Sequence, residues 1–157
     1  MKIIGRICKL RKSISILIII VILIITGCSN KEVIKHNYTY KGENEFWTAE
    51  YKVNGTGTFT EKDNKTSYES KCSKEFIVTY KKDLSELSSV KHLEISYKSS
   101  VGGGKTTEDF DDSPPNEKTY ILKKGGTGGA IENKDEVIEV TINLDGKIQT
   151  LELRNVQ

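Results

Sequence analysis

The chain has few of the residues that build disulfide frameworks and zinc centres. Its 157 residues include three cysteines and two histidines. Cys8 and Cys28 belong to the N-terminal segment, so only Cys72 remains in the folded part, where no intramolecular disulfide can form. His36 and His92 stand alone, without an HExxH pattern or paired histidines, so the sequence marks no zinc site.

Catalytic patterns are also lacking. No serine lies in a GxSxG turn, and no pair of acids is marked for glycoside hydrolysis. His92 is predicted to be an ordinary half-exposed strand residue. We therefore expect a protein that is not an enzyme and that needs no cofactor.

The part of the chain that folds has no large excess of charge of either sign. Five of the 24 basic residues and none of the 22 acidic residues precede Cys28, which leaves 19 basic against 22 acidic residues. A domain with such mixed charge has no electrostatic footprint for nucleic acid and no polybasic surface that would reinforce membrane binding. Nucleic acid is excluded as an expected partner.

The N-terminus, by contrast, carries a clear signal. Five basic residues precede an apolar run from Ile16 to Ile25, which ends at Thr26-Gly27-Cys28. This order predicts a signal peptide over residues 1–27, and residues 25–28 are typical of a lipobox. The run is about half of the roughly 20 residues that span a bilayer, and an uncleaved membrane helix is the alternative.

Cys28 is the predicted lipidation site. Its thiol would carry a diacylglyceryl group, and two acyl chains such as palmitate give stable anchoring where one chain is marginal. Residues 28–36 are predicted to form a mobile tether and residues 37–157 a single domain. The expected location is the extracytoplasmic face of the cell membrane.

The folded part shows an all-β pattern from Asn37 onward, because apolar residues recur there with period two between turn signals. Asn54-Gly55 is predicted to end one strand, and Asp83 to cap a single helical turn through Leu84 and Leu87. Seven or eight short strands favour a two-sheet antiparallel sandwich of immunoglobulin-like type, with a small antiparallel β-barrel as the alternative. The expected strands are 38–40, 47–53, 56–60, 66–72, 75–80, 92–97 and 119–123, followed by a C-terminal hairpin.

The C-terminal hairpin has a defined register. Asp145-Gly146 is a residue pair that a two-residue type I′ turn favours. The turn places Leu144 opposite Lys147, and counting outward predicts the pairs Ile142 with Gln149, Val140 with Leu151 and Ile138 with Leu153.

Two loop motifs contain residue types that can bind ligands. Gly102-Gly103-Gly104-Lys105-Thr106 resembles the end of a P-loop, but Ser99 stands where the first glycine is required, which argues against phosphate binding. Acidic residues follow, and their order does not match an EF-hand, so a solvated loop is expected and no metal is predicted. The weak candidates for calcium ligands there are Asp109, Asp111 and Asp112, beside Glu108.

Glycine clusters supply the candidate binding surface. If they lie at one end of the domain, their backbone groups could bind a partner together with Tyr97 and Tyr120; flexible loops are the alternative. The glycines are Gly102, Gly103, Gly104, Gly125, Gly126, Gly128 and Gly129.

Two single residues have competing interpretations. Cys72 is predicted to be a small buried strand residue, with a reactive thiol as the alternative. Trp47 is predicted to pack in the core, and otherwise would be an exposed anchor for a ligand.

The segment from Tyr40 to Val53 resembles one near the start of small uncharacterised lipoproteins of Bacillus-like and Clostridium-like bacteria. Gly42, Glu43, Glu45 and Trp47 fit their Gly-Glu-x-Glu-x-Trp motif, whereas Asn44 and Phe46 depart from its usual residues. The resemblance implies an extracytoplasmic β-rich domain and carries over no catalytic residue.

These features favour a lipid-anchored, non-catalytic binding module whose partner is an envelope protein or cell-wall component. One alternative is a solute or ion receptor that uses the glycine-rich and acidic loops. Another is an inhibitor or immunity lipoprotein that blocks a cell-wall hydrolase or a toxin. The ligand and the oligomeric state have no signature in the sequence.

Overall fold

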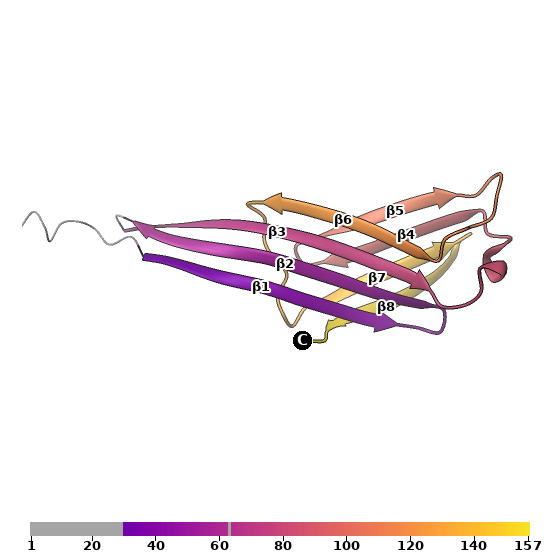
Figure 1. The fold of residues 1–157 in the computed structure, drawn as a ribbon, viewed down its shortest axis with the longest axis horizontal. Coiled ribbons are helices and arrows are strands. Elements are labelled where there is room, and N and C mark those ends of the chain that lie inside the picture. The colour runs from indigo at the N-terminus through magenta and orange to yellow at the C-terminus, as the bar shows by residue number, and fades with distance from the viewer. Residues whose placement is uncertain (1–29, 63) are drawn as a thin grey trace, which may run out of the picture. The chain divides into compact units, whose positions relative to one another are not determined.

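A computed structural model describes residues 30–62 and 64–157, and their fold is all-β, as predicted (Figure 1). The signal peptide and Cys28 lie outside the described residues. Among the described residues, no helix has the length and apolar character needed to cross a membrane. The strands are β1 (Asn30–Glu43), β2 (Trp47–Lys62), β3 (Lys65–Tyr80), β4 (His92–Ser99), β5 (Gly102–Asp109), β6 (Thr119–Thr127), β7 (Val137–Leu144) and β8 (Lys147–Asn155), with one 3-10 turn, η1 (Leu84–Leu87).

The chain divides into two compact units. Of the described residues, one unit contains 30–32, 59–62 and 64–67, where Ser67 Oγ donates to the carbonyl oxygen of Thr60 at 3.4 Å. The other unit contains 33–58 and 68–157.

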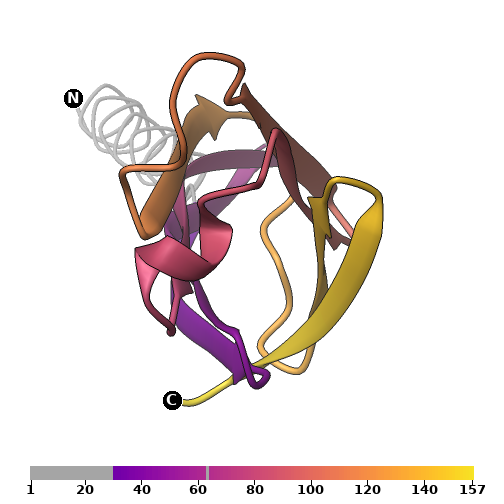
Figure 2. The ribbon, with the colours of Figure 1, turned by 90° about the vertical axis from the view of Figure 1, so that its right-hand side faces the viewer.

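The strands form one sheet in the order β5-β4-β7-β8-β1-β2-β3-β6. The two end strands, β5 and β6, come near each other, so the sheet of the second unit curls into a nearly closed barrel around a shared interior (Figure 2). This arrangement is consistent with the small-barrel alternative, and the two-sheet sandwich is not confirmed. Period-two patterning marks an inner and an outer face in both architectures, which is why it does not separate them.

Two connections cross the ends of the barrel. The chain passes from β3 through η1 to β4, and from β6 through residues 128–136 to β7, and each passage skips four strands in the sheet order. As predicted, η1 is a single helical turn. The Asp83 side chain makes no capping hydrogen bond, although the backbone oxygen of Asp83 accepts from the N–H of Glu86 at 3.1 Å.

The core is lined by the inward-facing residues of the strands and is rich in aromatic rings. Trp47 is fully buried, as predicted, with its ring centroid 4.9 Å from that of Tyr80 and 6.5 Å from that of Tyr120. Asn44 shapes the entry to this strand, because its Oδ1 accepts from the N–H groups of Phe46 at 2.9 Å and of Trp47 at 2.8 Å. Asn44 therefore stabilises the turn that precedes β2.

Gly42 also serves the fold. β1 pairs with β8 at this level, and a Cβ on Gly42 would clash with the carbonyl oxygen of Glu152 and with the Leu153 side chain. Only a residue without a side chain allows the two backbones to approach this closely.

Several predicted strand boundaries are wrong. β1 begins at Asn30, so residues 30–36, which were expected to precede the first strand, belong to it. β2 continues through Asn54-Gly55, and β3 is one strand where two were expected. A glycine ends a strand only if the chain turns there, and here Gly55 packs directly against Cys72 and Ile131 while the strand continues. The turn predicted between Lys62 and Lys65 is confirmed.

The predicted register of the C-terminal hairpin is confirmed at all four pairs. Asp145 and Gly146 have φ angles of 49° and 86°, and a type I′ turn requires both to be positive. The Asp145 carboxylate also accepts from the backbone N–H of His92 at 2.7 Å, which ties the turn to the start of β4.

A Gly146→Val substitution is expected to lower the free energy of unfolding by about 1–3 kcal/mol, because a β-branched residue is strained at positive φ. Urea unfolding measures this loss. Gly126→Val is the matched control, since a Cβ there meets nothing within 4 Å and its φ is not positive. Equal stability of the two variants would contradict the assigned role of the turn.

Candidate functional site

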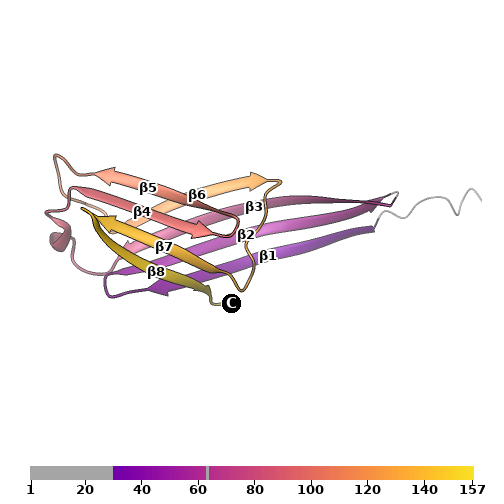
Figure 3. The same cartoon turned by 180° about the vertical axis from the view of Figure 1, so that it is seen from behind.

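The two glycine clusters lie at the same end of the barrel. β5 starts at Gly102 and β6 ends at Thr127, and Figure 3 shows the start of β5 and the arrowhead of β6 at one end, as Figure 1 does. Most of these glycines lie in strands, however, and not in loops. Gly102–Gly104 open β5, Gly125 and Gly126 belong to β6, and only Gly128 and Gly129 follow a strand.

Tyr97 and Tyr120 do not join the glycines on a surface. Both are buried, because they occupy inward-facing positions of β4 and β6. The Tyr97 ring lies against Gly104, where a Cβ would approach it to 2.6 Å. Burial raises the pKa of Tyr120 to about 12, with the charge of Glu108 as the next cause. Tyr120 is near the start of β6, away from the glycine end.

Beneath the glycine end lies a carboxylate that the sequence analysis did not identify. Glu132 is 1% exposed, and its segment, residues 128–136, brings it into the barrel. Its Oε1 accepts from Lys74 Nζ at 2.8 Å, Tyr51 OH at 2.7 Å and Ser99 Oγ at 3.1 Å. Its Oε2 is buried and has no hydrogen-bond partner among the described residues.

The segment that carries Glu132 is fastened at several points. Tyr40 OH donates to the Asn133 carbonyl oxygen at 2.6 Å, and the Gly128 N–H donates to the Ser70 carbonyl oxygen at 2.9 Å. Farther along, Ser100 Oγ donates to Glu136 at 2.9 Å. Residues from β1, β3 and the β4–β5 turn therefore hold the segment across the barrel end.

The surroundings of Glu132 keep the tyrosines neutral. Burial, followed by the hydrogen bond and the charge of Glu132, raises the pKa of Tyr51 far above its ordinary value. Burial and the charges of Glu132 and Glu136 also raise the pKa of Tyr40. Tyr51 consequently acts as a hydrogen-bond donor to Glu132 and stacks 4.9 Å from Tyr97.

Burial of the Lys74–Glu132 pair costs desolvation free energy, which is large for a small protein. The Lys74 side chain is 12% exposed and that of Glu132 is fully buried, so both charges have lost most of their water. The pair offsets this cost through direct contact and hydrogen bonds. The spare Oε2 leaves one buried acceptor position without a donor.

One signal could have revealed this cluster. Lys74 is an even number of residues away from Phe76, Val78 and Tyr80. It therefore shares with them the face of β3 that points into the core. An inward-facing lysine requires a buried acid. The sequence does not show which of 22 acidic residues supplies it.

The acidic candidates lie at the other end of β5. Asp109 Oδ1 is 2.6 Å from His92 Nδ1, a contact across the β4–β5 ladder, and Asp111 and Asp112 follow in the loop. Within residues 30–62 and 64–157, no group of three or more His, Cys, Asp or Glu side chains could hold a metal ion. His92 is thus paired with a carboxylate and does not stand alone.

Cys72 lies on the inward side of β3 and is half-buried beside Gly55. It is a free thiol in the described part of the chain. The predicted lipidation at Cys28 stays a prediction.

The comparisons with other proteins add no relative. No family model matches the chain, and neither a curated protein nor a solved structure is similar to it. The resemblance at Tyr40–Val53 therefore stays a prediction, and the function is argued from the site.

Replacing Lys74 with methionine is expected to destabilise the protein by about 3–5 kcal/mol, because it leaves Glu132 buried without a counter-charge. Denaturant unfolding measures this. Lys123→Met is the matched control, since its pair with Glu75 at 2.9 Å is exposed and should contribute little. Adding Glu132→Gln to Lys74→Met should recover part of the loss, and strict additivity of the two changes would contradict the pair.

Proposed function

We propose that this protein is a lipid-anchored, extracytoplasmic binding module without catalytic activity, and that its partner is an envelope protein or cell-wall component. The anchoring rests on the N-terminal sequence that ends at Cys28. The observation that carries the binding role is the seam between β5 and β6, the two end strands of the sheet, which glycines line at one end.

Glycine-rich edges suit recognition by the backbone. Without side chains at Gly103, Gly125 and Gly126, a partner chain can approach the N–H and C=O groups of both strands. The underlying scaffold is rigid, because the 128–136 segment is fastened from several strands. Rigid edges lower the entropic cost of binding.

The polar cluster supports a non-catalytic role. Lys74, Tyr51 and Ser99 all donate to Glu132 Oε1, and Glu132 is 1% exposed, so a substrate would have little access to the cluster. The cluster supports the barrel end and the segment above it.

Two changes test the proposal in intact cells. Cys28→Ala should release the protein from the membrane fraction, since the lipid supplies the anchor. A photo-crosslinking amino acid at Gly126, which is exposed, should capture one defined envelope partner. The same amino acid at Thr150, exposed on β8, is the control and should not capture it. Retention of the Cys28→Ala protein at the membrane, or identical products from both positions, would contradict the proposal.

A second candidate function is a solute receptor, which the unpartnered Oε2 of Glu132 favours. A bound amine could donate to that oxygen. Ammonium or a primary amine should then raise the unfolding free energy, by about 2.7 kcal/mol at a hundredfold excess over the dissociation constant. Glu132→Gln should abolish that rise, and an unchanged thermal midpoint with every amine would reject this candidate.

A further inference from the structure

We infer that the first half of β1 is a dimerisation surface, on which the same strand of a second copy of this chain pairs in antiparallel orientation, with Ile34 opposite Ile34. This surface lies on a different strand from the glycine seam, so the inference goes beyond the proposed function. It follows from where β8 ends, from the direction of the β1 backbone groups and from the side chains along the edge.

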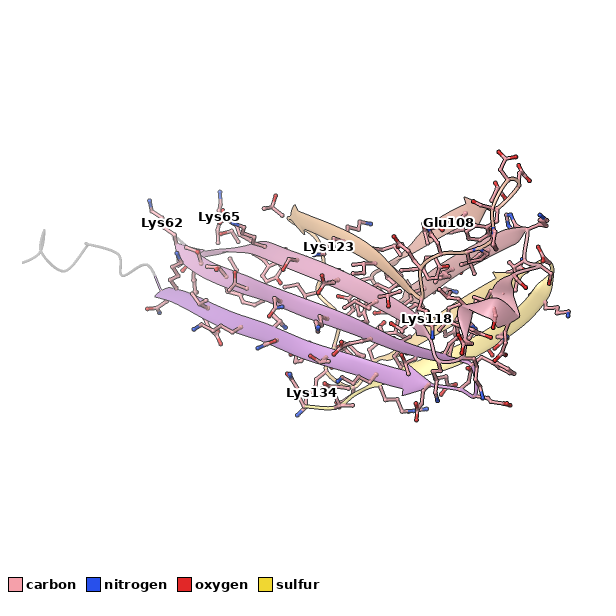
Figure 4. All side chains as sticks on the ribbon, turned by 45° about the vertical axis from the view of Figure 1, so that its right-hand side comes forward. Lys62, Lys65, Glu108, Lys118, Lys123 and Lys134 are labelled. Atoms are coloured by element: carbon pink, nitrogen blue, oxygen red, sulfur yellow. The ribbon has the colours of Figure 1, made fainter. Side chains whose placement is uncertain are left out.

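β8 covers only part of the edge of β1. The neighbours of β1 in the sheet order are β2 and β8. β8 pairs with it at Tyr40 and Lys41, and the N–H of Val156, just after β8, donates to the Thr39 carbonyl oxygen at 2.9 Å. Before Thr39, no strand of the described residues lies beside this edge (Figure 4). Residues 33–38 of β1 are therefore uncovered on the β8 side.

Odd-numbered residues of β1 turn their backbone groups toward the uncovered edge. The Thr39 carbonyl oxygen bonds on the β8 side, whereas the Asn44 N–H donates to a carbonyl oxygen of β2 at 2.9 Å. Successive residues of a strand point their N–H and C=O groups to alternate sides. Val33, Lys35 and Asn37 therefore offer donors and acceptors to a further strand.

The side chains along this edge are exposed and partly apolar. Val33 is 52% exposed and Ile34 is 39% exposed, and they lie on opposite faces because they are neighbours in a strand. β1 contains no proline, and Lys35 is the kind of charged side chain that protects an edge. A partner must therefore cover apolar side chains on both faces without bringing a like charge against Lys35.

A second copy meets both requirements in one register. When Ile34 lies opposite Ile34 of the other copy, Val33 lies opposite its Lys35 and Lys31 opposite its Asn37. The two isoleucines then form a non-hydrogen-bonded pair, in which opposed side chains are closest, and the odd-numbered residues form hydrogen-bonded pairs. The aliphatic stem of each lysine can lie along the opposed valine.

The neighbouring antiparallel registers fail. Pairing centred on Lys35 places Lys35 directly opposite Lys35 of the other copy, and pairing centred on Val33 places it opposite Lys31. Like charges in directly opposed positions destabilise a ladder. Pairing centred on His36 needs the Thr39 backbone, which already accepts from the residue after β8. The edge thus selects the register with Ile34 at its centre.

The dimer depends on concentration. A short two-stranded ladder is a small interface, whereas stable dimers bury about 1,200 Å² or more in total. We therefore expect weak pairing in dilute solution. In a membrane, the lipid anchors of the proposed function would hold both copies on one surface and raise their effective concentration. In this respect alone the inference rests on the proposed function.

Disulfide trapping in membranes tests the register. Ile34→Cys in the full chain places two thiols at the symmetric pair, where opposed Cβ atoms are about 4.5–5.5 Å apart and a small shift allows a disulfide. Mild oxidation should convert most of the protein to a covalent dimer. Ile121→Cys is the matched control, because Ile121 is an exposed isoleucine of β6 and should leave the protein monomeric. Both variants carry Cys72→Ala.

A mixed pair tests the same register without residue 34. Membranes that contain both the Val33→Cys and the Lys35→Cys protein should yield a covalent dimer of one with the other, because these residues are directly opposed. Either variant alone should yield much less, since its two thiols are only diagonal neighbours. Both proteins again carry Cys72→Ala.

Two variants of residue 33 isolate the backbone contribution. Val33→Pro removes an N–H that faces the uncovered edge and leaves the β2 ladder intact, so the dimer trapped through Ile34→Cys should be lost. Val33→Thr keeps the N–H and should retain the dimer.

Four results would overturn the dimer: no covalent product from Ile34→Cys, equal products from Ile34→Cys and Ile121→Cys, a dimer that persists with Val33→Pro, or a covalent product that contains a different protein. The proposed function fails separately. If Cys28→Ala releases the protein while the anchored Ile34→Cys protein stays monomeric, the lipid anchor stands and the dimer is wrong. If the Cys28→Ala protein stays at the membrane while Ile34→Cys forms the dimer, the dimer stands and the anchor is wrong.

Discussion

The buried ion pair between Lys74 and Glu132 is the interaction on which the glycine end of the barrel depends. It joins β3 to the segment between β6 and β7, and Tyr51 and Ser99 add donors from β2 and β4. Four separate parts of the chain therefore meet at one carboxylate oxygen. Breaking such a pair would leave an uncompensated charge in the core. The ion pair therefore stabilises the position of the segment between β6 and β7.

The contacts that hold the 128–136 segment also support the two strands that border the open seam, β5 and β6. The sheet ends at β5 and β6, and both of these strands are paired along their full lengths, β5 with β4 and β6 with β3. A flexible pair of edges would lose conformational entropy on binding, whereas edges on a rigid barrel lose less. The polar cluster thus lies inside the barrel end whose seam is lined by the glycines of β5 and β6.

Much of the local structure could be predicted. The Asp145-Gly146 turn and its register followed from backbone sterics at two residues, and the burial of Trp47 followed from its place in an alternating strand. The boundaries at Gly55 and at Gly102–Gly104 were wrong, because glycine signals conformational freedom without saying whether the chain uses it to turn or to let another segment approach. Gly55 is used for close packing against Ile131, a residue 76 positions later in the chain.

The sequence by itself determined the all-β class, the hairpin register and the expectation of a lipid anchor, because each depends on neighbouring residues and on local sterics or hydrophobicity. Only the tertiary structure decided that the sheet curls toward closure, that its open seam lies between β5 and β6, and that Glu132 meets Lys74. These depend on contacts between residues far apart in the chain, which a period-two pattern leaves undetermined. Many strand orders share that pattern, and packing of the whole core selects one.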